Sequence, residues 1–125
     1  YEMLETGHQV LSIGYPGLLR DRTADLPVAR KGTIASQYGV PFDRDPIFIV
    51  DARMHDGTSG SPVFTNPNTI LHSLTGEYDS RYGVIALLGI HSTTYKQPSE
   101  EESERRLDLN GVWHAELIED ILESI

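Results

Sequence analysis

The sequence feature that most constrains the fold is a succession of short apolar or alternating runs between residues 7 and 84, each broken by Gly, Pro or Asp. Runs of this length with such breaks are typical of antiparallel strands joined by tight turns. They predict strands at residues 8–15, 28–40, 46–52, 61–65 and 83–95, with a short sixth strand at 110–113. Gly32 indicates a β-bulge or a point where another part of the backbone approaches closely. The continuous apolar run in 46–52 predicts a strand that is buried on both faces.

The C-terminal residues follow a different period. Their apolar side chains recur at intervals of three and four residues, with acidic residues outside the stripe: Ala115, Ile118, Ile121, Leu122 and Ile125. This spacing predicts one amphipathic helix at about 114–124. The preceding segment, residues 96–111, has no apolar period that we recognise, and we interpret it as a solvated acidic loop.

Length and charge bound the possible functions. A chain of 125 residues is about one domain, so we treat 1–125 as a single unit. The formal net charge of −9 argues against a nucleic-acid-binding surface, which needs clustered Lys and Arg. With no cysteine, the chain has neither disulfides nor thiolate chemistry. We expect no membrane segment in this chain, and nothing in the sequence indicates a cellular location.

The string that suggests chemistry is "HDGTSGSPVF", residues 55–64. A serine hydroxyl is a poor nucleophile unless a base removes its proton and donors await the charge on the attacked carbonyl. Glycines at positions 57 and 60 permit positive φ, which can direct the amides of Gly57 and Ser59 to one point. The same residue types also make ordinary hairpin turns. These residues alone leave both interpretations open.

The string resembles the nucleophile motif of chymotrypsin-fold (trypsin-like) serine peptidases, Gly-Asp-Ser-Gly-Gly-Pro, and the Gly-Asn-Ser-Gly-Ser-Pro of bacterial glutamyl endopeptidases. Three other stretches fit in order: "VLSIGYPG" and "VARKGTIAS" are similar to the first strands of that family's second barrel, and "LLGIHSTTY" to the strand lining its specificity pocket. The resemblance covers nearly the whole chain, but it corresponds to only the second of the family's two barrels. It implies an all-β fold, an antiparallel six-stranded Greek-key barrel with a C-terminal α-helix, and a first barrel absent from this chain.

The resemblance assigns Ser59 as the nucleophile and the amides of Gly57 and Ser59 as the oxyanion hole. The rival hydroxyl is Ser61, which would fit the Gly-x-Ser-x-Gly turn of α/β-hydrolases. That turn leads from a strand into a helix, whereas here Pro62 begins an apolar run typical of a strand.

The resemblance also implies a substrate-binding pocket formed by His91, Ser92, Thr93 and Arg53. His91 stands in the "GIH" string that glutamyl endopeptidases share, and Arg53 falls six residues before the nucleophile, at the expected base of the pocket. Together the two cationic groups would favour Glu or Asp before the cleaved bond, with Gln second. The alternative is that His91 is a core residue and that Arg53 turns outward to pair with Asp51 or Asp56.

Two departures from the family pattern matter. Thr58 replaces the Asp that precedes the nucleophile in the pancreatic enzymes, so activation by an ion pair to a new N-terminus is not expected. The catalytic His and Asp of the first barrel have no counterpart, because His8 lies where the family has no catalytic residue. Zinc is not indicated, since neither His-x-His nor His-Glu-x-x-His occurs, and we predict no cofactor.

These observations leave two functions of different classes. The first is the C-terminal half of a trypsin-like serine endopeptidase that acts on polypeptides, needs an N-terminal barrel carrying His and Asp, and is inactive alone. The second is a non-catalytic module on a degenerate peptidase fold that holds an extended peptide at a strand edge.

Overall fold

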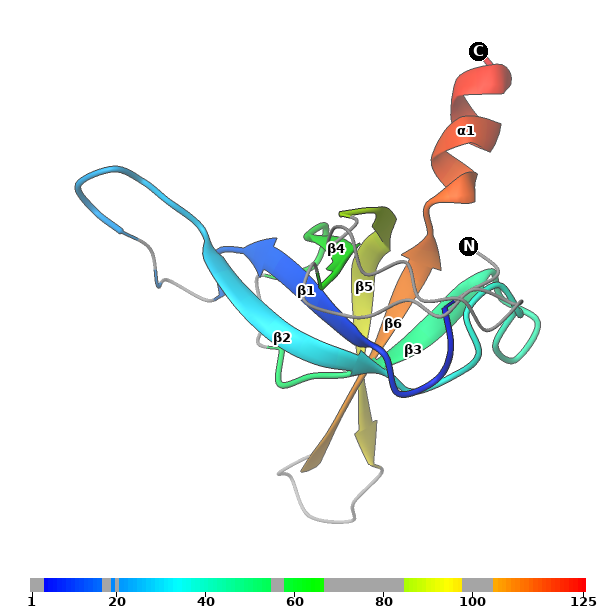
Figure 1. Cartoon of the computed structure of the whole chain (residues 1–125), viewed down its shortest axis with the longest axis horizontal. Coiled ribbons are helices and arrows are strands. Elements are labelled where there is room, and N and C mark those ends of the chain that lie inside the picture. The colour runs from blue at the N-terminus through cyan, green and yellow to red at the C-terminus, as the bar shows by residue number, and fades with distance from the viewer. Residues whose placement is uncertain (1–3, 17–18, 20, 55–57, 67–84, 98–104) are drawn as a thin grey trace, which may run out of the picture.

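The computed structural model describes residues 4–16, 19, 21–54, 58–66, 85–97 and 105–125 (Figure 1). Within these residues the chain forms six strands and one helix, in the order β1 (Gln9–Gly14), β2 (Val28–Ile34), β3 (Ile47–Asp51), β4 (Pro62–Thr65), β5 (Leu87–Gln97), β6 (Arg105–His114) and α1 (Glu116–Glu123).

The strands close into a barrel with the order β1-β2-β3-β6-β5-β4, and β4 pairs back onto β1. Every pairing is antiparallel. The predicted all-β, six-stranded antiparallel barrel with a C-terminal helix is therefore confirmed. The expected Greek-key connection is consistent with this order, because β3 and β4 follow each other in sequence without being neighbours in the sheet.

The core fills the barrel interior with apolar side chains from all six strands and the adjoining turns. In β3, Phe48 and Val50 point into the interior, while Ile47 and Ile49 are buried on the opposite face, as the continuous apolar run predicts. The members of the interior cluster are Leu4, Val10, Ile34, Phe48, Val50, Ala52, Met54, Val63, Leu88 and Val112.

Gly32 occupies a close approach between strands, as predicted. A Cβ at this position would lie 2.9 Å from both the Ala52 Cβ and the Val50 Cγ1 atoms. Because Gly32 has no side chain, the end of β3 can pack directly against β2 at this position.

A buried amide joins three strands near the same end of the barrel. The Asn110 Nδ2 atom donates to the Ala52 carbonyl oxygen at 2.6 Å, and the Asn110 Oδ1 atom accepts from the Thr94 hydroxyl at 3.0 Å. Asn110 is fully buried, and these bonds satisfy its polar atoms on both sides.

The loop prediction for residues 96–111 was wrong at both ends. β5 continues to Gln97 and β6 begins at Arg105, so the two strands form a long hairpin. Leu107 and Leu109 do alternate with polar neighbours, which is a strand period, but the surrounding charged residues obscure it. These residues form a strand because they pair with β5 and β3, and the local sequence carries no information about those partners.

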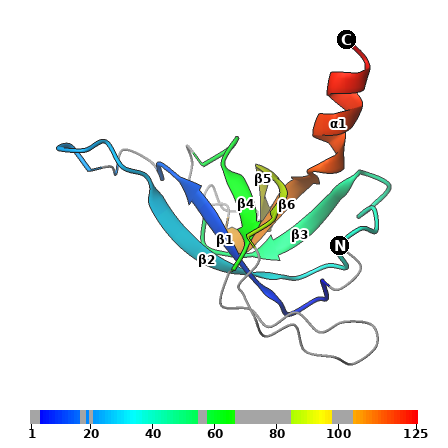
Figure 2. The same cartoon turned by 45° about the horizontal axis from the view of Figure 1, so that its top comes forward.

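Helix α1 forms slightly inside its predicted bounds and projects away from the barrel in both views (Figures 1 and 2). Its apolar stripe is not buried within the part of the chain that the structure describes: Ile121 and Leu122 are 62% and 65% exposed. No described helix is long and apolar enough to cross a membrane.

Candidate functional site

The serine loop, residues 58–61, lies between the end of β3 and the start of β4. The Ser61 backbone N–H donates to the Thr58 carbonyl oxygen at 3.0 Å, which closes the turn, and Gly60 has a φ of +89°. This is the positive φ that the sequence predicts for Gly60. Ser59 lies at the exposed tip of the turn, whereas Ser61 is 8% exposed.

Strand β5 holds the serine loop in place. The Gly60 N–H donates to the His91 carbonyl oxygen at 2.8 Å, and the His91 N–H donates to the Ser61 carbonyl oxygen at 2.9 Å. The Ser59 hydroxyl donates to the Ser92 carbonyl oxygen at 2.9 Å. Three bonds to two consecutive residues of β5 thus fix both the backbone of the loop and the direction of the serine side chain.

A buried side-chain pair lies beneath the loop. The Thr58 Oγ1 and His91 Nδ1 atoms share a hydrogen bond of 3.2 Å, and the two residues are 3% and 2% exposed. The His91 Nε2 atom is also buried, and it has no hydrogen-bond partner among the described residues. A buried polar atom without a partner costs free energy, so this nitrogen is a point where a further polar group would be stabilised.

A groove of about 380 Å³ opens beside Ser59 on the β1 side of the loop. Its lining combines the serine loop with apolar and small residues of β1 and the β1–β2 connection: Ile13, Gly14, Tyr15, Pro27, Ser59, Gly60, Ser61 and Pro62. A Cβ at Gly14 would collide with the Ser61 hydroxyl. Gly14 thereby lets β1 approach the loop closely and form a wall of the groove.

The remaining predicted site residues are placed as follows. Ser92 and Thr93 follow His91 on β5, with the Thr93 hydroxyl donating to the Ser92 hydroxyl at 3.3 Å. Gly57 lies outside the described residues. The Arg53 side chain is 73% exposed, and its Nε atom lies 4.0 Å from an Asp108 carboxylate oxygen. The structure therefore brings His91 and Ser92 together with Ser59, but it turns Arg53 outward.

Apart from His91, the described histidines form their hydrogen bonds away from the serine loop. The His8 Nδ1 atom accepts from the Glu5 N–H at 3.0 Å, and the His114 Nε2 atom accepts from the Gly39 N–H at 3.1 Å. None of the described histidines is hydrogen-bonded to Ser59. His55 and His72 lie outside the described residues. Among the residues that the structure places, no three His, Asp or Glu side chains gather as a metal site.

Sequence reasoning missed three contributors to this site. The Ser92 carbonyl is a main-chain group, so the residue type at position 92 does not reveal its role. Thr58 was treated as a departure from a family pattern, and its hydroxyl bond to His91 depends on a contact across 33 residues. Gly14 lies inside the strand predicted at residues 8–15 and was given no role, although a glycine inside a strand also indicates close packing.

The comparisons with known proteins add no family. No protein-family model matches the chain, and a search of curated proteins found no match.

Proposed function

We propose that this chain is the nucleophile-bearing barrel of a trypsin-like serine endopeptidase. The observation that supports this most is the state of Ser59, an exposed hydroxyl at the tip of a turn that is fixed by hydrogen bonds to β5 and borders a groove. The two backbone bonds continue the pairing of β4 with β5, but a turn alone does not require the side-chain bond that holds the Ser59 hydroxyl beside the groove.

The chemistry of the proposal begins at the Ser59 oxygen. In the intact enzyme a base removes the hydroxyl proton as the oxygen attacks the carbonyl carbon of the scissile bond. The negative charge that develops on the carbonyl oxygen needs preorganised donors. Within the described part of the chain the Ser59 backbone N–H forms no hydrogen bond, so we propose it as one donor to that oxygen. The Gly57 amide, the other donor that the resemblance implies, lies outside the described residues.

The substrate backbone has a docking edge next to the serine. Strand β5 extends past the end of β4, since the pairing of these two strands stops at Pro62 and Ile90. From Thr93 onward, within the described residues, β5 pairs with β6 alone. An extended peptide could add to this edge by main-chain hydrogen bonds, which would carry its scissile bond past Ser59.

The proposed preference for Glu or Asp before the cleaved bond depends on His91 alone, because Arg53 points into solvent near Asp108. The support is the buried Nε2 atom of His91, which has no partner in the described structure and could donate to a carboxylate or an amide. Digestion of a peptide library by the two-barrel protein tests the preference. Cleavage after Lys, Arg or large apolar residues would contradict it.

A second candidate function is peptide binding without cleavage. Two observations favour it: the edge of β5 past its pairing with β4, and the hydrogen bond that directs the Ser59 proton to the Ser92 carbonyl instead of to a base. The two functions make the same prediction for peptide binding and opposite predictions for the reactivity of Ser59.

The decisive experiment measures that reactivity in the longer protein that would carry the first barrel. A fluorophosphonate probe is added to the wild type, to Ser59→Ala and to Ser61→Ala, and the labelled peptide is identified by mass spectrometry. The endopeptidase proposal expects stoichiometric labelling at Ser59 that is lost in Ser59→Ala and kept in Ser61→Ala. Labelling at Ser61, or none at either serine while a cognate peptide still binds, would overturn it.

A further inference from the structure

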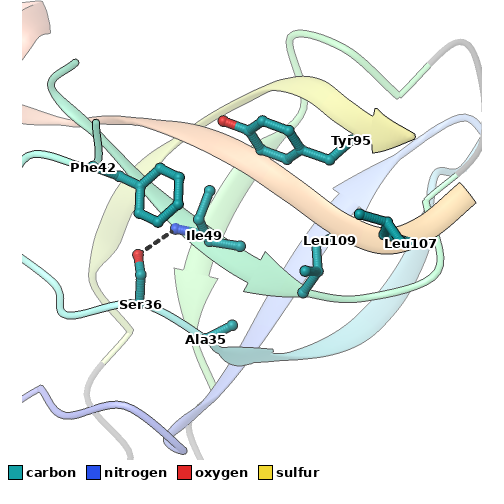
Figure 3. Close-up of a pocket in the computed structure, with 7 residues that line it drawn as sticks. All are labelled: Ala35, Ser36, Phe42, Ile49, Tyr95, Leu107 and Leu109. Atoms are coloured by element: carbon teal, nitrogen blue, oxygen red, sulfur yellow. Dashed lines mark hydrogen bonds between the residues drawn. The ribbon is translucent and has the colours of Figure 1, made fainter. Parts of the chain in front are cut away.

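A second hollow, of about 290 Å³, lies on the outer face of the barrel (Figure 3), and none of its lining residues belongs to the serine loop. Its floor belongs to the face opposite the core: Ile49 pairs with Gly111 and lies between Phe48 and Val50, which both point inward. The lining residues are almost all apolar: Ala35, Ser36, Phe42, Ile49, Tyr95, Leu107 and Leu109. This size suits one long side chain rather than a whole small molecule.

Two aromatic rings stand over this floor (Figure 3). The ring centroids of Phe42 and Tyr95 are 6.5 Å apart, and the ring planes are inclined at 65°. Tyr95 lies next to Gly111 of β6, where a Cβ would be in ordinary van der Waals contact with the Tyr95 hydroxyl oxygen, at 3.5 Å. The two rings thus form an angled corner whose faces can attract a cation.

Carboxylates border the same corner. Phe42 and Asp45 exchange two backbone hydrogen bonds of 3.0 Å across a turn in which Asp43 and Arg44 have φ values of 50° and 71°. Residues directly opposite each other in such a pair project to the same face, so Asp45 shares the side of Phe42. In the described structure neither Asp43 nor Asp45 forms an ion pair, not even with Arg44.

The state of Tyr95 agrees with this placement. Burial raises the pKa of the Tyr95 hydroxyl above its usual 10.0, and the charges of Asp45 and then Asp43 raise it further. Both carboxylates are therefore near enough to act on the ring that lines the hollow. The other polar group of the lining is occupied, since the Ser36 hydroxyl accepts the Ile49 N–H at 2.8 Å (Figure 3).

We propose that this hollow is a binding site for the side chain of a lysine or arginine in a polypeptide partner. The apolar floor takes the aliphatic stem, and the rings and the carboxylates of Asp43 and Asp45 take the charged head. This division follows from the apolar lining of the hollow and from the pairing that puts Asp45 on the same side as Phe42. The site is independent of the function proposed for Ser59.

The charge also decides against two other occupants. An acidic ligand would meet Asp43 and Asp45 at the edge of the hollow. The exposed stripe of α1 in a second copy would bring its own acidic residues, Glu116, Glu119, Asp120 and Glu123, to the same place. Like charges brought together in this way are repelled, so a basic partner is favoured over self-association.

The test uses amide chemical shifts of the chain during titration with four capped amino acids: the N-acetyl, N-methylamide derivatives of lysine, arginine, norleucine and glutamate. The lysine and arginine probes should shift Phe42, Tyr95 and Leu107 with a dissociation constant of about 1 mM, from the affinity per atom that small ligands reach. Norleucine, which has the stem without the charge, should bind about tenfold more weakly. Glutamate should not bind.

Two variants show whether the charge acts at this place. Asp45→Asn should reduce the preference for lysine over norleucine severalfold while leaving norleucine binding unchanged. Glu123→Gln, which removes one charge from α1, should have no effect and is the matched control. The proposal is overturned if lysine and norleucine bind equally, if glutamate binds best, or if none of the four probes shifts these residues at concentrations well above the expected constant.

Discussion

The Ser59 hydroxyl donates its hydrogen bond to the carbonyl oxygen of Ser92, at 2.9 Å, on a strand 33 residues away in sequence. Strand β5, which holds the backbone of the serine loop, thus also directs the proton that a nucleophile must lose. A base would have to displace this bond before Ser59 could attack a carbonyl.

The first prediction follows from this bond. The chain alone should react with a fluorophosphonate probe no faster than a site with donors but no base, whose residual catalysis is about 10³ to 10⁴ over water and far below that of a working peptidase. Labelling rates are measured by mass spectrometry, with Ser59→Ala as the control. Fast stoichiometric labelling of the wild type would mean that the chain contains a base, and the prediction would be wrong.

The second prediction concerns the contact between β1 and the serine loop. Gly14→Ala should lower the free energy of unfolding by about 1 to 3 kcal/mol, because the new methyl group collides with the Ser61 hydroxyl. The variant Gly14→Ala/Ser61→Gly removes the obstacle and should recover part of the loss. Urea unfolding of both single variants and the double variant measures the effect. Additive losses would show that the two positions do not touch.

The third prediction concerns the buried pair of Thr58 and His91 beneath Ser59. A double-mutant cycle of Thr58→Val and His91→Leu should give a coupling free energy of about 0.5 to 1.5 kcal/mol, the usual net value of one hydrogen bond. His91→Asn keeps a polar atom near the position of Nδ1 and should retain part of the coupling. A coupling free energy of zero would mean that the Thr58–His91 hydrogen bond does not contribute to stability.

Much of this fold could be predicted from the sequence, and the reasons differ between elements. Strand β3 was predicted because its apolar run is local and strong, and Gly32 because a glycine inside a strand has few other uses. The first half of β6 was missed because its charged residues become a strand only when β5 and β3 lie beside them. Local pattern contains no information about such a partner.

The candidate site divides in the same way. The turn at Ser59 and Gly60 could be predicted, because the residue types that favour tight turns are recognisable in the sequence. The orientation of Arg53 could not, since its choice between the groove and Asp108 depends on where β6 passes. Neither could the corner formed by Phe42 and Tyr95, whose rings meet across more than fifty residues of sequence.

The fourth prediction uses the buried amide of Asn110. Asn110→Leu keeps a side chain of similar size but removes the donor to the Ala52 carbonyl, which keeps its bond from the Met54 N–H, and removes the acceptor of the Thr94 hydroxyl. The free energy of unfolding should fall by about 1 to 3 kcal/mol, the cost of leaving a buried polar group without its partner. Thr94→Val, which affects one of the two contacts, should cost less. Equal losses in the two variants would mean that the Ala52 contact contributes nothing.

The fifth prediction concerns pH. Because the pKa of Tyr95 is raised in the folded chain, the folded state holds this proton more tightly than the unfolded state does. The contribution to stability is therefore constant below pH 10.0 and is lost as the pH rises through the higher folded value. Titration of the Tyr95 ring by NMR should give a midpoint above 10.0 in the wild type and a lower midpoint in Asp45→Asn. A midpoint that Asp45→Asn leaves unchanged would place the carboxylate away from the ring.

The bonds between the serine loop and β5 also order events in time. Residues 58–61 receive their shape from residues 91 and 92, and contacts between segments so far apart form only after the chain has met the entropy of closing the loop between them. These bonds reach β5 alone, so the turn needs β5 beside β4 but does not need β4 to pair with β1, the contact that closes the barrel. In a refolding experiment the chemical shifts of Ser59 and Gly60 should therefore report when β5 takes its place beside β4.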